Sequence, residues 1–299
     1  MKRKGIILAG GSGTRLYPLT LVSSKQLLPI YDKPMIYYPM ATLMENKIRE
    51  ILLISSPDQI PLYQKLFGDG KKLGINLEYK VQKHPNGLAE AMILAESFLN
   101  GSPSVLILGD NVFYGSFFSK IFSKANKNKK STIFTYQVNN PQDYGVLSLK
   151  KNGKINSIIE KPLKTLSGLA VTGIYFYDSK ASAYAKNLKP SKRGELEITD
   201  LNNVYLKKKK LTFEVIDKQT IWLDCGSCEN LLLAGEYFRT IEIRQGIKAA
   251  CLEEIAFINN WISENEIKKM ATENAKNSYG KYLLKVCNEY KHSFKNKKF

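Results

Sequence analysis

The stretch GIILAGGSGTRLYPLT, residues 5–20, decides the fold, because it joins a short apolar strand to a glycine-rich loop. A strand that ends in such a loop is typical of α/β proteins that bind phosphate. Glycines permit positive φ angles and let a ligand approach the backbone closely. The loop offers N–H and hydroxyl groups to a phosphate from Gly10, Gly11, Ser12, Gly13 and Thr14.

This loop fits neither of the two commonest phosphate-binding motifs. A P-loop would read GxxxxGK[ST], and a dinucleotide-binding loop would have a glycine where Leu16 stands. Pro18 and Pro29 oppose the long regular helix that follows both motifs. A simple tight turn is the less favoured alternative, because it needs neither so many glycines nor the basic residues beside them. The loop therefore predicts a phosphate site of another kind.

Short apolar runs alternate with segments of helical period through the first half of the chain. We expect strands at residues 5–8, 51–54, 77–81, 105–108 and 132–136. One helical face is formed by Ile36, Met40, Leu43 and Met44, and another by Leu88, Met92, Ala95 and Leu99. This alternation predicts a Rossmann-like α/β fold with a mixed, mostly parallel sheet flanked by helices. Ligands bind at the carboxyl ends of the strands in such sheets.

The middle of the chain changes character. Residues 144–162 read as two strands joined at Asn152-Gly153, a strong hairpin signal, and residues 171–178 read as a third strand. We expect this small antiparallel insert to lie beside the parallel sheet. After a short strand at residues 221–224, Leu231, Ala234, Phe238 and Ile241 form a helical stripe that Gly246 is placed to end. The pattern favours a core of residues 1–225 and a helical extension, residues 226–299, packed on the same domain.

Charged residues follow the loop and two of the strands. Arg15 and Lys25 could stabilise the charge that develops on a departing pyrophosphate, although a lone cation is more often a solvated surface residue. Asp110 and Asp224 each end an apolar strand, where two carboxylates could share Mg²⁺ with substrate phosphates. A turn or helix N-cap is the alternative for each aspartate. Glu160 in the tripeptide EKP is a weak candidate for binding sugar hydroxyls, and Lys161 for binding phosphate.

The composition narrows the class of protein. Of the 299 residues, 43% are hydrophobic, and the formal net charge is +18. Lysines gather in residues 124–130 and 207–210 and in the tail, without interleaved aromatic residues, so a solvated surface is favoured over a nucleic-acid site. No apolar run approaches the length of about 18 residues that suggests a membrane span, and the N-terminus reads as a strand rather than a signal peptide. We expect a cytoplasmic protein.

The four cysteines form no disulfide framework. Cys225 and Cys228 make a C-x-x-C pair, which raises the alternatives of a redox pair or a zinc site. Zinc would need two further ligands, and neither Cys251 nor Cys287 has a suitable spacing. Incidental thiols are the favoured interpretation.

Taken in order, these segments resemble the sugar-1-phosphate nucleotidylyltransferases over about residues 3–290. The glycine loop marks only the broad superfamily. SKQLLPIYDKPMIYYP (residues 24–39) and GELEITD (residues 194–200) are more specific to the thymidylyl branch. The resemblance implies Mg²⁺-dependent transfer of the thymidylyl group of dTTP to glucose 1-phosphate, giving dTDP-glucose and pyrophosphate for deoxysugar (dTDP-rhamnose type) and cell-surface polysaccharide synthesis.

The resemblance also implies roles for individual residues. The glycine loop, Arg15, Lys25 and Gln26 would surround the nucleotide phosphates, and Gln82 with the backbone of Gly87 would read the thymine. Asp110 and Asp224 would hold Mg²⁺, and Lys161 would bind the phosphate of glucose 1-phosphate. The glucose and ribose pocket would be lined by Asn111, Tyr144, Gly145, Glu160, Val171, Thr172 and Trp222.

Members of this family are usually homotetramers with a feedback site for a dTDP-sugar at a subunit interface, to which Tyr114 and Gly115 would belong. Cys225-Gly226-Ser227 replaces the Thr-Gly-Thr that usually follows WLD, and the lysine runs are also unusual. Two alternatives stay open: a sister enzyme that uses another nucleotide or sugar, and a non-catalytic nucleotide-sugar sensor. The presence of Arg15, Lys25 and Asp110 disfavours a sensor.

Overall fold

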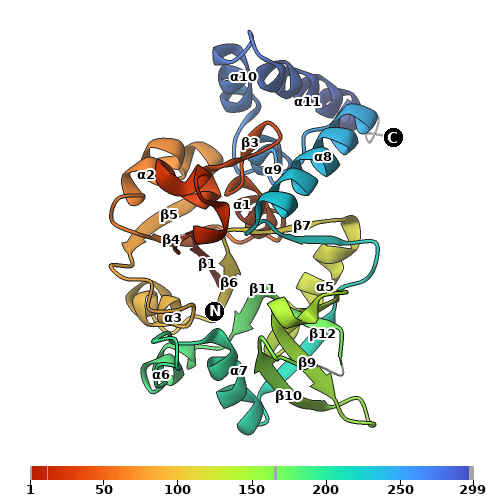
Figure 1. The fold of residues 1–299 in the computed structure, drawn as a ribbon. Helices are drawn as coiled ribbons and strands as arrows, with labels where there is room; N and C mark the ends of the chain where they lie inside the picture. Colours follow the sequence, from red (N-terminus) through yellow and green to blue (C-terminus); the bar gives the residue numbers. More distant parts are fainter. Residues whose placement is uncertain (1, 12, 165–166, 296–299) are drawn as a thin grey trace.

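A nine-stranded mixed sheet lies at the centre of the computed structural model, which describes residues 2–11, 13–164 and 167–295 (Figure 1). Seven of its strands follow one another in the order β10-β9-β11-β6-β1-β4-β5, and β8 joins β11 to β12. The strands are β1 Lys4–Leu8, β4 Glu50–Ser55, β5 Asn76–Val81, β6 Ser104–Leu108, β8 Ser131–Gln137, β9 Gly145–Leu149, β10 Ile155–Glu160, β11 Leu169–Tyr177 and β12 Leu211–Val215. Two small antiparallel pairs accompany the sheet: β7 Asn111–Tyr114 with β13 Ile221–Asp224, and β2 Pro29–Ile30 with β3 Lys33–Pro34.

The strand directions place the amino ends of six strands at one edge of the sheet. β1, β4, β5 and β6 pair in parallel. β11 runs antiparallel to both β6 and β8, so β8 has the direction of β6, and β12 is parallel to β8. The carboxyl ends of these strands therefore share the opposite edge.

Helices cover both faces of the sheet. The helices are α1 Tyr37–Glu45, α2 Ile60–Phe67, α3 Glu90–Leu94, α4 Glu96–Leu99, α5 Ser116–Lys127, α6 Ala181–Lys186, α7 Ile198–Lys207, α8 Cys228–Gln245, α9 Leu252–Ile258, α10 Glu264–Glu273 and α11 Ser278–Lys295. Figure 1 shows α1, α9 and α10 on one side of the sheet and α3, α6 and α7 on the other. Among the described residues, none of the helices has both the length and the hydropathy needed to span a bilayer.

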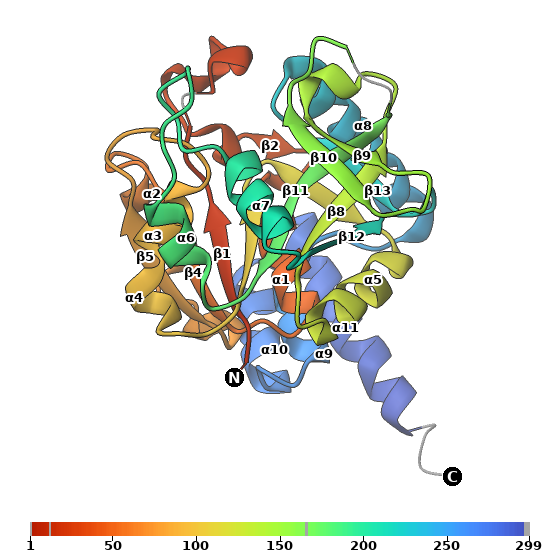
Figure 2. The same ribbon diagram turned by 90° about the horizontal axis from the view of Figure 1, so that it is seen from below.

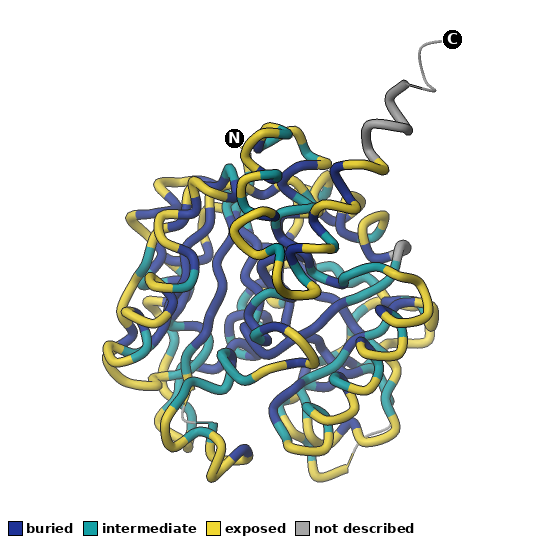
Figure 3. The backbone as a smooth tube through the Cα atoms, turned by 90° about the horizontal axis from the view of Figure 1, so that it is seen from above, coloured by how far each residue is buried: buried dark blue, intermediate teal, exposed yellow. Residues whose placement is uncertain are grey.

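Alternation along the strands explains the two-sided core. Ile7 packs into the cluster beneath α1, α2, α5 and α9–α11, whereas its neighbours Ile6 and Leu8 pack into the cluster beneath α3, α4, α6 and α7. A strand that buries both faces must be apolar at consecutive positions, which is why the sequence shows unbroken apolar runs. Figure 2 shows helices around the central strands, and Figure 3 shows buried backbone in the interior of the molecule and exposed positions toward its periphery.

The structure confirms the predicted strands and the mostly parallel sheet, and it corrects two expectations. The antiparallel insert does not lie beside the sheet, because β11 pairs directly with β6 and makes the insert part of the same sheet. The single helix expected over Leu88–Leu99 is two short helices, α3 and α4. The N–H of Ala89, just before α3, donates to the carbonyl of Leu196 (3.0 Å).

Candidate active site

The carboxyl edge of the sheet collects most of the candidate residues. The glycine loop follows β1, Gln82 follows β5, and Asp110 follows β6. The chain reaches this edge again through β13, which ends at Asp224. Arg15 and Asp224, which are 209 positions apart in the sequence, are therefore neighbours here.

The glycine loop has the backbone that its composition predicts. Gly11 and Gly13 have φ angles of 97° and 60°, a region that side chains disfavour. The loop leads into three short 3₁₀ turns, Thr14–Leu16, Leu19–Leu21 and Lys25–Leu27, rather than a long helix, as the prolines indicate. Gly10 and Gly11 line cavities at this edge of the sheet, whereas Gly13 and Thr14 are not part of their linings. Ser12 lies outside the described residues.

Two carboxylates meet where β7 and β13 pair. The pairing sets Asp224 opposite Asn111, and the N–H of Cys225 donates to the carbonyl of Asp110 (2.9 Å). Burial and the nearby charge of Asp110 raise the pKa of Asp224 to about 6. Burial also opposes ionisation of Asp110, but the Lys25 ammonium prevails and holds the pKa of Asp110 below its ordinary value. The two carboxylates repel each other when both are ionised, and a cation bound between them would relieve that repulsion.

Two cations flank these carboxylates. The Lys25 ammonium forms an ion pair with Asp110, and although burial opposes its charge, Asp110 raises the pKa of Lys25. The Arg15 guanidinium lies 3.8 Å from Asp224, measured from Nη2 to Oδ2, and 62% of its side chain is exposed. Gly226 allows this approach, because a Cβ there would lie 2.5 Å from Nη2 of Arg15. Lys25 is thus fixed, whereas Arg15 retains room to move toward a ligand.

The first cavity at this edge, of about 160 Å³, is bordered by the glycine loop and two glutamines. Its lining includes Gly10, Gly11, Lys25, Gln26, Gln82, Gly87, Leu88, Asp110 and Glu195. Nε2 of Gln82 donates to Glu90 (2.7 Å), and Nε2 of Gln26 donates to the carbonyl of Gly10 (3.2 Å). An adjoining cavity of about 280 Å³ extends past Lys25 to Ser24, Gln59 and Lys83.

The second cavity of the site, of about 220 Å³, lies on the other side of Asp110. Its lining includes Arg15, Asp110, Asn111, Tyr144, Gly145, Glu160, Lys161, Val171, Tyr175, Thr199, Trp222 and Asp224. The backbone of Lys161 is left-handed, with a φ of 42°, and strain of this kind gathers at functional positions. Thr172 does not line the cavity; it is fully buried, and its hydroxyl donates to the carbonyl of Phe134 (3.2 Å).

Asn111 ties the second cavity to the carboxylates. Its Oδ1 accepts from the indole N–H of Trp222 (2.7 Å) and from the N–H of Gly173 (3.0 Å). Its Nδ2 donates to Asp110 (3.1 Å). The amide orientation follows from these partners, so Asn111, Trp222 and Asp110 form one rigid unit.

Sequence reasoning missed two residues that orient the candidate residues. The Thr199 hydroxyl donates to Oε2 of Glu160 (2.6 Å), and Glu90 accepts from Gln82. Thr199 lies in the stretch GELEITD, but no spacing in the sequence links it to Glu160. Leu196 in the same stretch packs against Gly87, where a Cβ would lie 2.5 Å from the Leu196 carbonyl oxygen.

The remaining candidates lie away from this edge or make no cluster. Tyr114 lines a separate cavity of about 390 Å³ with residues from 247 to 282; Gly115 is not part of that lining. Cys225 is buried and Cys228 is exposed at the start of α8, and neither forms a disulfide. In the part of the chain that the structure describes, no three His, Cys, Asp or Glu side chains gather as a metal cluster.

Comparisons with known proteins agree with this arrangement. A family model described as nucleotidyl transferase matches residues 4–240. The chain is 50% identical over 287 residues to a glucose-1-phosphate thymidylyltransferase of Xanthomonas campestris pv. campestris, covering 96% of this chain and 97% of the relative. It is 45% identical over 283 residues to the enzyme of the same name from Mycobacterium tuberculosis, covering 95% and 98%.

Solved structures give a similar picture. A Bacillus anthracis protein described as a glucose-1-phosphate thymidylyltransferase, solved with a sucrose, matches with a TM-score of 0.73 and 40% identity, covering 79% of this chain and 95% of that chain. A UDP-glucose pyrophosphorylase complexed with UDP-glucose matches with a TM-score of 0.71 and 25% identity, covering 80% and 99%. Both solved structures are therefore similar to about four fifths of this chain.

Proposed function

The chain belongs to the nucleotidyl transferase family, and we propose that it transfers the thymidylyl group of dTTP to glucose 1-phosphate, giving dTDP-glucose and pyrophosphate. One observation carries the proposal: a carboxylate pair with two cations stands between two cavities at the carboxyl edge of the sheet. One cavity suits a nucleotide and the other a sugar phosphate, so the reacting phosphates of both substrates meet at Asp110 and Asp224.

In this proposal the nucleotide binds in the first cavity. Gln82, with its amide nitrogen held by Glu90, presents its oxygen toward Gly10, and with the backbone at Gly87 it binds the thymine edge. The N–H groups of the glycine loop and Lys25 surround the phosphates, and Gln26 lies against the nucleotide. The role of Ser12 and Thr14 in this loop is part of the same proposal.

In this proposal glucose 1-phosphate binds in the second cavity. Glu160 accepts hydrogen bonds from sugar hydroxyls, and its hydrogen bond from Thr199 fixes the carboxylate in one orientation. Lys161, at the mouth of the cavity, holds the phosphate of glucose 1-phosphate. Tyr144, Val171 and Trp222 with Asn111 shape the apolar wall against which the sugar ring lies.

The chemical step is a displacement at the α-phosphorus of dTTP. A phosphate oxygen of glucose 1-phosphate attacks in line, and the bond to the pyrophosphate oxygen breaks. The nucleophile is already an anion, so neither a general base nor a covalent intermediate is needed. Two polyanions must be brought together, which makes charge neutralisation and alignment the main contributions of the protein. Arg15 and Lys25 stabilise the departing pyrophosphate, and Lys161 aligns the nucleophile.

Nucleotidyl transferases of this family are generally metal-dependent, and the residues present fit a divalent cation. Asp110 and Asp224 are two buried carboxylates, and burial together with the charge of Asp110 raises the pKa of Asp224. Two carboxylates without a third protein ligand suit Mg²⁺, which usually completes its shell with water and substrate phosphates. We propose Mg²⁺ for this site, where the bound ion supplies positive charge that neutralises the phosphate oxygens of both substrates.

The proposal also covers the oligomeric state, the cellular location and the domain organisation of the enzyme. We propose a homotetramer in the cytoplasm, with residues 1–225 as the catalytic core and residues 226–299 as a helical extension of the same domain. The cavity beside Tyr114 is lined largely by residues of this extension, and its charged members are Lys47, Lys248, Glu45 and Glu254. Its place between the core and the extension supports a feedback site for a dTDP-sugar near Tyr114 and Gly115. Light scattering measures the assembly, and inhibition by dTDP-rhamnose measures the feedback.

The reaction itself is tested by product analysis. The purified chain is incubated with dTTP, glucose 1-phosphate and Mg²⁺, and the products are identified by ³¹P NMR. We expect stoichiometric dTDP-glucose and pyrophosphate, and no product after the metal is chelated. A chain that binds dTDP-glucose but forms no pyrophosphate would be a sensor, and the proposed reaction would be wrong.

A further inference from the structure

Basic residues precede most of the strands that begin at the amino edge of the sheet, the edge opposite the proposed active site. Because the six strand starts share this edge, segments far apart in the sequence bring their charges together there. The residues concerned are Lys2 and Arg3 before β1, Lys47 and Arg49 before β4, Lys71 and Lys72 before β5, Lys129 and Lys130 before β8, and Lys207–Lys210 before β12. The amino edge is therefore strongly cationic.

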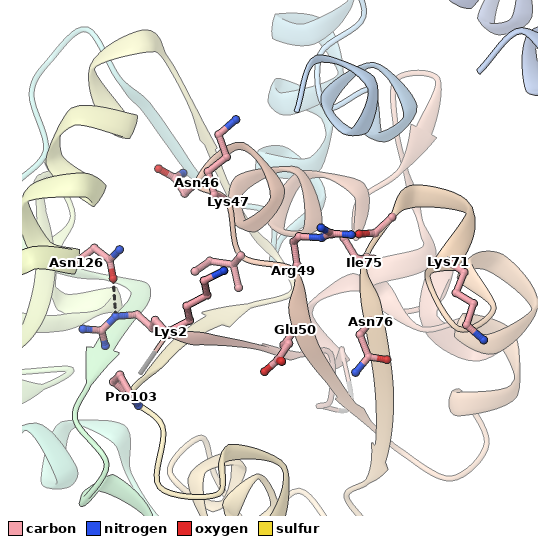
Figure 4. A pocket seen from close by; sticks show the side chains of 13 residues that line it. Lys2, Asn46, Lys47, Arg49, Glu50, Lys71, Ile75, Asn76, Pro103 and Asn126 are labelled. Atoms are coloured by element: carbon pink, nitrogen blue, oxygen red, sulfur yellow. Dashed lines mark hydrogen bonds between the residues drawn. The ribbon is translucent and has the colours of Figure 1, made fainter. Parts of the chain in front are cut away.

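A wide cavity of about 900 Å³ opens at this edge (Figure 4). Five cations and a single carboxylate line it, together with polar and backbone groups: Lys2, Arg3, Lys47, Arg49, Lys71 and Glu50 are the charged members. Glu50 is partly neutralised from outside the cavity, because Lys4 lies 3.0 Å from it, and Lys71 is in turn paired with Asp69 (2.7 Å), which lies outside the lining. Figure 4 shows Asn126 on one side of the cavity and Arg49 and Asn76 on the other, with Lys2 between them.

Arg3 is held rigidly at one wall. Its Nη1 donates to the carbonyl oxygens of Ser104 and Tyr177 (2.8 Å each), and its Nε donates to Asn126 (2.9 Å). The guanidinium also lies over the ring of Phe176, 4.9 Å from its centroid. Burial lowers the pKa of Arg3 to about 10, although Asp178 opposes the shift, so a further anion beside it would be stabilising. Nη2 donates to no acceptor within the described residues.

Arg49 is oriented in the same way at the other wall. Its Nε donates to the carbonyl of Gly74 (2.7 Å), and its guanidinium lies over the ring of Trp261, 5.2 Å from the centroid. The two terminal nitrogens donate to no acceptor in the part of the chain that the structure describes. A guanidinium fixed at Nε with both terminal nitrogens available is already arranged to bind two oxygens of one phosphate.

We propose that this cavity binds an anion that carries two or more phosphate groups. Two oriented guanidinium groups on opposite walls, with Lys2 between them, offer separate positions for separate phosphates. A cavity of about 900 Å³ lies within the range of ordinary small-molecule sites. The lysines along the rest of the edge raise the local concentration of such an anion. The site is independent of the proposed transfer reaction.

The test measures the binding of inorganic tripolyphosphate to the full chain by isothermal titration calorimetry. An excess of dTDP-glucose keeps the proposed nucleotide cavities occupied during the titration. The informative variant is Lys2→Gln with Arg49→Gln, and Arg49→Lys separates the guanidinium geometry from its charge. The matched control is Lys151→Gln with Lys154→Gln, two exposed lysines in the turn between β9 and β10. The four substituted residues lie outside the proposed catalytic cavities.

We expect the wild type and the control to bind tripolyphosphate equally, with an affinity that falls as ionic strength rises. The double variant should raise the dissociation constant at least about tenfold, which corresponds to about 1.4 kcal/mol, and Arg49→Lys should fall between the two. Turnover without tripolyphosphate should be unchanged in all variants. Equal binding by the double variant and the wild type, or no binding by the wild type, would overturn the proposal.

A second arm separates a soluble anion from a lipid headgroup. The same variants are sedimented with vesicles of phosphatidylglycerol and, as a control, of phosphatidylcholine. We expect the double variant and the wild type to bind each kind of vesicle to the same extent. Binding to phosphatidylglycerol vesicles that is lost in the double variant, without tripolyphosphate binding, would contradict a soluble ligand and assign this edge to a membrane surface.

Discussion

At the scale of single residues, the two buried aspartates differ in pKa because their surroundings differ. Lys25 keeps Asp110 ionised, whereas burial and the charge of Asp110 raise the pKa of Asp224 to about 6. Because the pKa of Asp110 is lowered and that of Asp224 is raised, Asp224 is the carboxylate that a proton reaches first as the pH falls. Metal binding should be most sensitive to the protonation of Asp224.

Metal affinity should fall as the pH is lowered through about 6. A protonated carboxyl group is a poor metal ligand, so below the raised pKa of Asp224 a proton competes with the cation, and the affinity falls up to tenfold per pH unit. Mn²⁺ binding followed by electron paramagnetic resonance between pH 5 and 7.5 measures the effect. An affinity that stays constant across this range would remove Asp224 from the metal site.

Replacing either aspartate by asparagine should abolish most of the activity. Asp110→Asn and Asp224→Asn each remove a charge from the point where the phosphates meet, and we expect turnover to fall at least about 10²-fold. Pyrophosphate release measures the rate, and Glu273→Gln, at an exposed carboxylate at the end of α10, is the control. Near-normal turnover in either variant would exclude that residue from the transition-state contacts.

At the scale of elements, α7 positions the second cavity. Thr199 in its first turn donates to Glu160 at the end of β10. The isosteric variant Thr199→Val removes this hydrogen bond without changing the packing. We expect the KM for glucose 1-phosphate to rise about three- to tenfold, the scale of one hydrogen bond, with little change in the KM for dTTP. Equal changes in both KM values would indicate a general loss of structure instead.

The hairpin of β2 and β3 is joined to α8 by a buried group of charges. Glu242 of α8 accepts from Lys33 (2.8 Å) and Lys248 (3.0 Å), and Asp32 forms ion pairs with both lysines. Breaking a buried ion pair leaves an uncompensated charge, so Glu242→Gln should lower the free energy of unfolding by about 3–5 kcal/mol. Urea denaturation measures it, and Glu236→Gln on the exposed face of α8 should change it little. A loss as small as that of the control would contradict the structural role of this group.

The elements also show what a sequence can predict. The strands of the parallel sheet were predictable because strands buried on both faces are continuously apolar. β7 was not, because its four residues are recognisable only beside β13, more than 100 positions away. For the same reason the sequence placed Asp110 and Asp224 at strand ends but could not show that the ends are adjacent. The sequence did not point to Thr199 and Glu90, the hydrogen-bond partners of Glu160 and Gln82. A hydrogen bond between side chains of different elements produces no recognisable spacing in the sequence.

At the scale of the whole molecule, the two edges of the sheet differ in character. The carboxyl edge combines carboxylates with cations around two cavities, while five cations and one carboxylate line the cavity at the amino edge. Two of the lysine runs, which suggested only a solvated surface in the sequence, contribute to this edge, because Lys129 and Lys130 precede β8 and Lys207–Lys210 precede β12. The net charge of +18 is therefore distributed unevenly, with the proposed chemistry on the side where positive and negative groups alternate.

The measurement that tests the proposed reaction most directly is a comparison of kcat/KM for pyrophosphate release with each nucleoside triphosphate. dTTP, UTP, CTP, GTP and ATP are each supplied with glucose 1-phosphate and Mg²⁺, and the dTTP reaction is repeated with galactose and mannose 1-phosphates. The account predicts the highest kcat/KM for dTTP with glucose 1-phosphate, and its loss in Asp110→Asn. A kcat/KM for UTP or CTP far above that for dTTP, or activity that survives Asp110→Asn, would contradict it.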